Sequence, residues 1–165
     1  MYKIIQNFFL KRQLKSFSPQ KPDGVSGSKF GVLYNVERFD EEQIRISIEN
    51  NFDIVASELN FLGFCNSLEY KYENDGNVFS LKDFTLFGQH DSEVISAFIN
   101  QNYKVMFNFF DKDQTCLELI SQQTKAELKV GFSNCNQQIN DLLLILDAND
   151  IDFFKESSKY IKHIL

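Results

Sequence analysis

The sequence has no tryptophan and few of the residues that bind metals, form disulfides or interrupt regular structure. Its 165 residues include only two histidines, two prolines and three cysteines. The cysteines form no C-x-x-C pair, and neither His90 nor His163 has a thiol or a second imidazole at ligand spacing. We therefore predict no structural metal and expect all three thiols to be reduced and mostly buried.

Long apolar runs are also absent, and none approaches the roughly 18 consecutive residues of a membrane-spanning helix. The short apolar segment from Ile4 to Leu10 has its strongest charges after it and lacks a small-residue cleavage site, unlike a secretion signal. We therefore expect a cytoplasmic protein. Hydrophobic residues still make up 43% of the chain, which is enough for one core, and the length suits a single domain.

Acidic residues are missing from the first 22 positions, which carry five basic residues. The rest of the chain holds 12 basic and 23 acidic residues, so its net charge is −11. Such a body repels polyanions except through the basic segment. Accordingly, we do not expect a nucleic acid or a membrane surface to be the partner.

The basic segment has the pattern of an amphipathic helix over residues 1–17, with Ile4 and Ile5 followed by two phenylalanines on the same face. Residues 18–28 contain both prolines and predict a linker. We thus divide the chain into an arm and linker, residues 1–28, and one α/β domain, residues 29–165. An apolar helix face needs a cover, which is either the protein's own body or a protein partner. The candidate partner-binding residues are Phe8, Phe9, Lys11, Arg12 and Lys15.

Short apolar runs alternate with helical patterns through the rest of the chain. Helices are predicted from Asp40, over Val94 to Ile99, after Asp111 and from about Asp150. Strand, helix, strand alternation implies right-handed crossovers and parallel pairing. The sequence therefore predicts a Rossmann-like three-layer α/β domain with a mostly parallel sheet of about five strands. These strands are expected near Phe30, Leu59, Val105, Leu128 and Leu142.

Between the second and third of these strands, residues 66–90 are polar and irregular. Residues 74–77 form a turn that could join a small hairpin.

A ligand crevice in such a sheet lies beyond the carboxyl ends of the strands. Here that edge comprises residues 34–37, Asn66, Asp111 and residues 133–135. The turn after the first strand has no G-x-G-x-x-G motif to cradle phosphates. No cofactor is therefore predicted.

The strand near Val105 is followed by a D-x-D-x-T pattern that starts at Asp111. This pattern resembles the signature of haloacid dehalogenase phosphatases, which implies that Asp111 is a nucleophile, Asp113 a general acid and Mg²⁺ the bridge to phosphate. Ser121, Lys129 and Asp141 are available as further site residues but are irregularly placed. The alternative interpretation, which we prefer, is that the acids cap a helix and complement its dipole.

Two short segments resemble an uncharacterised family of small α/β proteins from flavobacteria and related Bacteroidota. They are residues 125–131, KAELKVG, and residues 140–142, NDL, before an apolar strand. The resemblance covers most of the chain from Lys29 onward and implies no activity. Together with the missing phosphate loop and metal cluster, it favours a non-enzymatic binding or regulatory module that acts through protein–protein contacts. The alternative is the Mg²⁺-dependent phosphatase or phosphotransferase.

Overall fold

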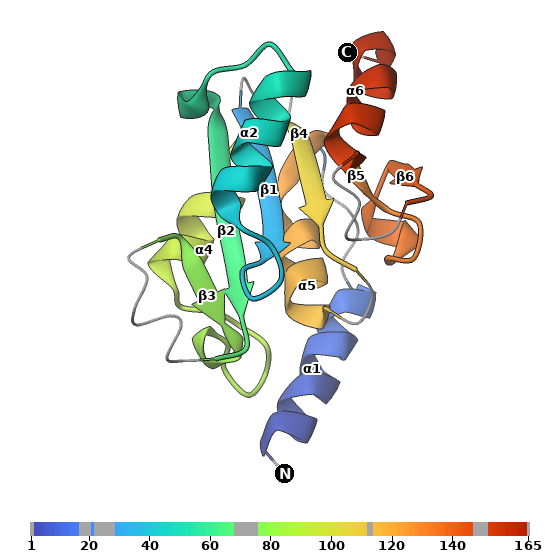
Figure 1. Ribbon diagram of the computed structural model, residues 1–165. Coiled ribbons are helices and arrows are strands. Elements are labelled where there is room, and N and C mark those ends of the chain that lie inside the picture. Colours follow the sequence, from blue (N-terminus) through green and yellow to red (C-terminus); the bar gives the residue numbers. More distant parts are fainter. Residues whose placement is uncertain are drawn as a thin grey trace.

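The computed structural model describes residues 2–16, 21, 29–67, 76–111, 114–146 and 152–164. Within this part of the chain, α-helices and parallel strands form one α/β fold (Figure 1). The strands are β1 (Lys29–Asn35), β2 (Leu59–Cys65), β3 (Val78–Ser80), β4 (Asn102–Phe109), β5 (Lys125–Phe132) and β6 (Leu142–Leu144). The helices are α1 (Tyr2–Ser16), α2 (Glu41–Asn51), α4 (Glu93–Ile99), α5 (Thr115–Gln123) and α6 (Phe153–Ile164), with single 3₁₀ turns η1 (Ala56–Glu58), η2 (Leu81–Asp83) and η3 (Gln137–Ile139).

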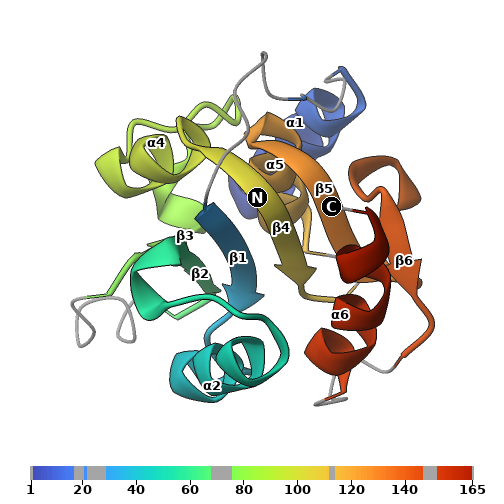
Figure 2. The same cartoon turned by 90° about the horizontal axis from the view of Figure 1, so that it is seen from above.

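All six strands are parallel and lie in the order β3-β2-β1-β4-β5-β6. The central strands are continuous apolar runs because helices cover both faces of the sheet. In Figure 2, α2 and α6 lie on one face, whereas α4 and α5 lie on the other. The predicted Rossmann-like three-layer fold is therefore confirmed, and each of the five predicted strands is present.

The sixth strand, β3, was missed, and the small hairpin suggested around residues 74–77 stays a prediction, because its first strand would lie outside the described residues. Val78, Phe79 and Ser80 pair in parallel with the end of β2. A strand of three residues is too short to show either alternation or a long apolar run. Residues 74 and 75 lie outside the described part of the chain.

The helix starts show where local capping signals suffice and where they fail. Asp40 caps α2 as predicted, since its carboxylate accepts a hydrogen bond from the Gln43 amide at 3.0 Å. Helix α4 (Glu93–Ile99) contains the predicted segment Val94 to Ile99, and the Ser92 side chain caps it by accepting from the Ile95 amide. Helix α5 begins at Thr115 after Gln114, so the prediction that Asp111 caps it is wrong.

Helix α1 packs on the outer side of α5, so α5 lies between the sheet and α1. Leu10 is completely buried in this contact, and the buried Gln6 amide donates to the carbonyl of Phe84 at 2.7 Å. Helix α5 is consequently covered all round, and even its Ser121 and Gln122 side chains are buried. The N-terminal helix is predicted correctly, and it contributes to the core.

The face that α1 turns to the body is not the one that carries the two phenylalanines. The protein's own body was one of the two covers expected for that apolar face, but Phe8 is 63% exposed and Phe9 reaches only the edge of the contact, where its ring meets Phe87. The docked face instead consists of Gln6, Leu10 and Leu14. The apolar pattern missed it because glutamines that donate to loop carbonyls occupy part of that face.

Candidate functional site

The strand order reverses direction between β1 and β4, which places a topological switch point at their carboxyl ends. Open α/β sheets bind ligands in the crevice at such a point. In this protein the crevice would lie between residues 36–40, which follow β1, and Asp111, which follows β4. The side chains found there decide whether a ligand could enter.

Aromatic rings fill the crevice. Phe39, in the loop after β1, packs on Phe109 of β4 with ring centroids 4.6 Å apart. Phe109 in turn contacts Phe154 of α6 at 4.9 Å, and Phe132 of β5 stacks on Phe153 at 4.5 Å. These rings are close-packed and all but Phe39 are buried. The chain therefore uses its own side chains where related folds hold a ligand.

Polar contacts tie the strand ends together above these rings. Arg38 after β1 forms an ion pair with Asp111 after β4 and also lies over the Phe39 ring. Glu37 accepts hydrogen bonds from the amides of Asn66 and Ser67 at 3.0 and 2.8 Å, and from the Asn66 side chain at 2.9 Å. Burial by itself raises the pKa of Glu37, but these hydrogen bonds outweigh it and hold the pKa below its usual value. The carboxylates at this edge thus serve as links between strand ends.

The residues of the phosphatase hypothesis do not form a visible catalytic set. Asp111 is engaged by Arg38, and Asp113 lies outside the described residues. Lys129 and Ser121 do meet, but the Lys129 ammonium donates to the Ser121 carbonyl inside the layer between β5 and α5. Asp141 bonds to Lys21 and to the Lys129 amide. Ser121, Lys129 and Asp141 are therefore in contact with one another, because Lys129 of β5 bonds to both of the others.

The cysteines are unsuited to nucleophilic chemistry. None of Cys65, Cys116 and Cys135 forms a disulfide, and all three are buried, as expected. Burial raises the pKa of Cys116 and of Cys135 to about 12, so both stay protonated at neutral pH. Cys135 also donates to the Phe110 carbonyl, which adds a link between the ends of β4 and β5.

Lys129 is the one lysine that is buried, at 2% exposure, within the described part of the chain. Loss of hydration lowers its pKa to about 8, although Asp141 partly opposes the shift. The unfolded chain holds this proton up to pH 10.5, so the unfolded state binds more protons than the folded state between pH 8 and 10.5. The charge on Lys129 therefore destabilises the fold below pH 8, and this cost fades as the pH rises.

We expect Lys129→Met to remove that pH dependence. The lowered pKa corresponds to a cost of about 3 kcal/mol at neutral pH. The variant removes this cost but also loses the hydrogen bond from Lys129 to the Ser121 carbonyl, so a net gain in stability of about 1 kcal/mol is expected. From pH 7 to 9 the parent protein should gain about 1 kcal/mol from this group, and the variant should not. Urea unfolding at both pH values tests this, with the exposed Lys162→Met as control. An equal pH response in parent and Lys129→Met would show that Lys129 is not the source.

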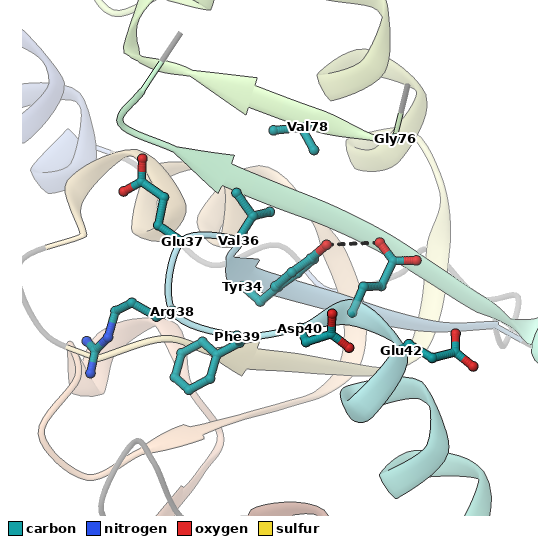
Figure 3. A pocket seen from close by; sticks show the side chains of 10 residues that line it. Tyr34, Val36, Glu37, Arg38, Phe39, Asp40, Glu42, Gly76 and Val78 are labelled. Atoms are coloured by element: carbon teal, nitrogen blue, oxygen red, sulfur yellow. Dashed lines mark hydrogen bonds between the residues drawn. The ribbon is translucent and has the colours of Figure 1, made fainter. Parts of the chain in front are cut away.

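A hollow of about 600 Å³ opens beside the filled crevice, between the end of β1, the start of α2 and β3 (Figure 3). We call it the acidic hollow, because the described residues that line it include Glu37, Asp40, Glu41 and Glu42 and one basic residue, Arg38. Three of these carboxylates belong to the cap and first turn of α2. They occupy the helix end at which phosphates bind in nucleotide-binding folds, so the hollow disfavours anions and suits a cationic group.

The second exposed feature is the face of α1 that points away from α5. It carries Ile4, Ile5 and Phe8 in its first half and Lys11, Arg12 and Lys15 in its second half, and we call these six residues the outward face. Ile4 is 74% exposed, and all three cations are exposed. Four of the five candidate partner-binding residues thus lie together on one face, whereas Phe9 lies beside it.

Two further kinds of site are absent from the described residues. There, no group of three or more histidine, cysteine, aspartate or glutamate side chains is placed to hold a metal ion. None of the helices in this part of the chain has both the length and the apolar character needed to cross a membrane.

Comparison with known proteins yields a family but no activity. A family model matches residues 3–164, and the chain belongs to this family of unknown function (DUF6913). The match includes α1 as well as the sheet, so the helix is part of the family's pattern. Neither the search of curated proteins nor that of solved structures found a match.

Proposed function

We propose that this DUF6913 protein is a non-enzymatic binding module of the cytoplasm, and that it acts through protein–protein contacts made by the outward face of α1. The proposal rests on the different surroundings of the two faces of this helix. One face packs on α5 and on the loop after β3, where Leu10 is buried and Gln6 donates to the Phe84 carbonyl, whereas the opposite face keeps Ile4 and Phe8 exposed. An apolar surface held in place in this way marks an interaction site.

The composition of the outward face supports a protein partner. An exposed aromatic ring beside two isoleucines supplies apolar area that a partner can bury, and the adjoining cations can form a polar rim. The filled crevice and the inert thiols supply no catalytic group. Three buried cysteines that form no disulfide also suit a reducing compartment, which supports a cytoplasmic location.

Affinity purification with point variants tests the proposal without removing α1, which the core requires. We expect Phe8→Glu to lose the partners that the parent protein retains, because a carboxylate cannot be buried in an apolar contact. Val55→Glu is the control. Val55 is also exposed, at 61%, but it precedes β2 and so lies at the amino ends of the strands. Retention of the same partners by both variants would refute the outward face as the contact surface.

A second experiment tests the enzymatic alternative. We expect the purified protein to hydrolyse p-nitrophenyl phosphate no faster than buffer, with or without Mg²⁺, because Arg38 neutralises Asp111 and no phosphate cradle adjoins it. Release of p-nitrophenol is followed by absorbance. Mg²⁺-dependent turnover that Asp111→Asn abolishes would overturn the non-enzymatic proposal.

A further inference from the structure

The chain carries two exposed surfaces of opposite charge. The outward face of α1 presents three cations next to exposed apolar side chains. The acidic hollow is lined by four carboxylates, of which Glu41 and Glu42 also form ion pairs with Arg45 of α2, and its floor includes the buried Val36 and Val78. Each surface thus combines an apolar part with charge, and the charges are complementary.

These two surfaces cannot meet within one molecule. Helix α1 is held on α5, on the opposite face of the sheet from α2, whose first turn borders the hollow (Figure 2). Both surfaces nevertheless belong to the same end of the molecule. The hollow lies at the carboxyl ends of β1 and β2, and α1 extends beyond those strand ends (Figure 1).

This placement is compatible with a two-fold symmetric dimer. A two-fold axis that lies in the plane of the sheet and runs across the strands brings two carboxyl edges face to face and also exchanges the two faces of the sheet. Each α1 then lies opposite the hollow of the other copy, and the same contact forms twice. Because α1 projects past the strand ends, it is the element that can reach across such a contact.

We infer that the outward face of α1 docks in the acidic hollow of a second copy of this chain, which forms a two-fold symmetric dimer. The inference rests on the proposed function, since it names the partner of the same surface. Phe8 packs against the floor formed by Val36 and Val78, while Lys11 and Lys15 face Glu42 and its neighbours. A hollow of about 600 Å³ has room for a phenyl ring, since volumes of this order enclose whole small molecules.

Charge exchange between the two surfaces tests the inference. The parent protein is expected to sediment as a dimer that dissociates on dilution and more readily at high salt, which screens exposed charges. Lys11→Glu with Lys15→Glu, and separately Glu42→Lys, should each weaken the dimer at least about tenfold, because like charges then face each other in both contacts. An equal mixture of the two variants should form a heterodimer, since both of its contacts again pair opposite charges.

Matched controls separate this effect from a change in net charge. Lys162→Glu on α6 and Glu49→Lys on α2 reverse exposed charges outside both surfaces, and both should remain dimeric. Melting temperatures near that of the parent protein show that each variant folds. A parent protein that stays monomeric at every concentration overturns the inference, as do reversed variants that still dimerise or a mixture that does not recombine. If the parent is monomeric but Phe8→Glu loses another protein, the proposed function stands and only the self-association fails.

Discussion

Leu10→Ala is expected to lower the free energy of unfolding by about 3 kcal/mol and the melting temperature by roughly 9 °C. Leu10 is completely buried between α1 and the body, so its truncation leaves a cavity in a contact that cannot collapse without moving the helix. Urea unfolding and calorimetry of the full-length variant measure the loss. The result would show that α1 is part of the folded core.

Phe8→Ala on the same helix is the matched control. Phe8 is larger than Leu10 but 63% exposed, so its truncation should change the free energy of unfolding by less than about 0.5 kcal/mol. If the two variants exchange their effects, α1 docks through the face that the sequence pattern predicted. If both are neutral, α1 is not docked on α5.

Phe109→Ala should have the largest effect of any single substitution considered, a loss of about 4 kcal/mol and roughly 12 °C. The Phe109 ring contacts the rings of Phe39, Phe132, Phe153 and Phe154, so it joins β4 to the loop after β1, to β5 and to α6. Its removal opens a cavity at the switch point. Urea unfolding measures the change.

Phe87→Ala provides the comparison, because that ring is 61% exposed. Phe87→Ala should lower the free energy of unfolding far less than Phe109→Ala does, since little of the Phe87 ring is removed from water on folding. A loss below about 1 kcal/mol for Phe109→Ala would mean that the crevice is loosely filled. It could then admit a ligand, and the non-enzymatic proposal would lose its main support.

The parts of the fold that could be predicted are those whose signal is local and long. Strands β1, β2, β4 and β5 each span seven or eight residues and read as apolar runs, because both faces of a parallel sheet are covered. The start of α2 was predictable because Asp40 and Gln43 are neighbours in sequence. Strand β3 was not, since its three residues depend on pairing with β2.

The candidate site shows the same division. The carboxyl edge and most of its residues could be named in advance, because strand ends follow from strand positions. The Arg38–Asp111 pair could not, since the two residues are far apart in sequence and meet only when β1 and β4 lie side by side. The acidic hollow was missed for a related reason. Its signal, three acids at the start of α2, is equally typical of an ordinary helix start, and only the position of β3 encloses the space above them.

By itself, the sequence determined the layered α/β class, the basic segment and the buried thiols, because composition and periodicity act within a few residues along the chain. Only the tertiary structure decided which face of α1 is covered. Leu10 is buried and Phe8 exposed although both are apolar, because α5 and the loop carbonyls that receive Gln6 lie on the Leu10 side. A helical pattern states which residues share a face, but the neighbour that covers a face is set by packing among segments distant in sequence.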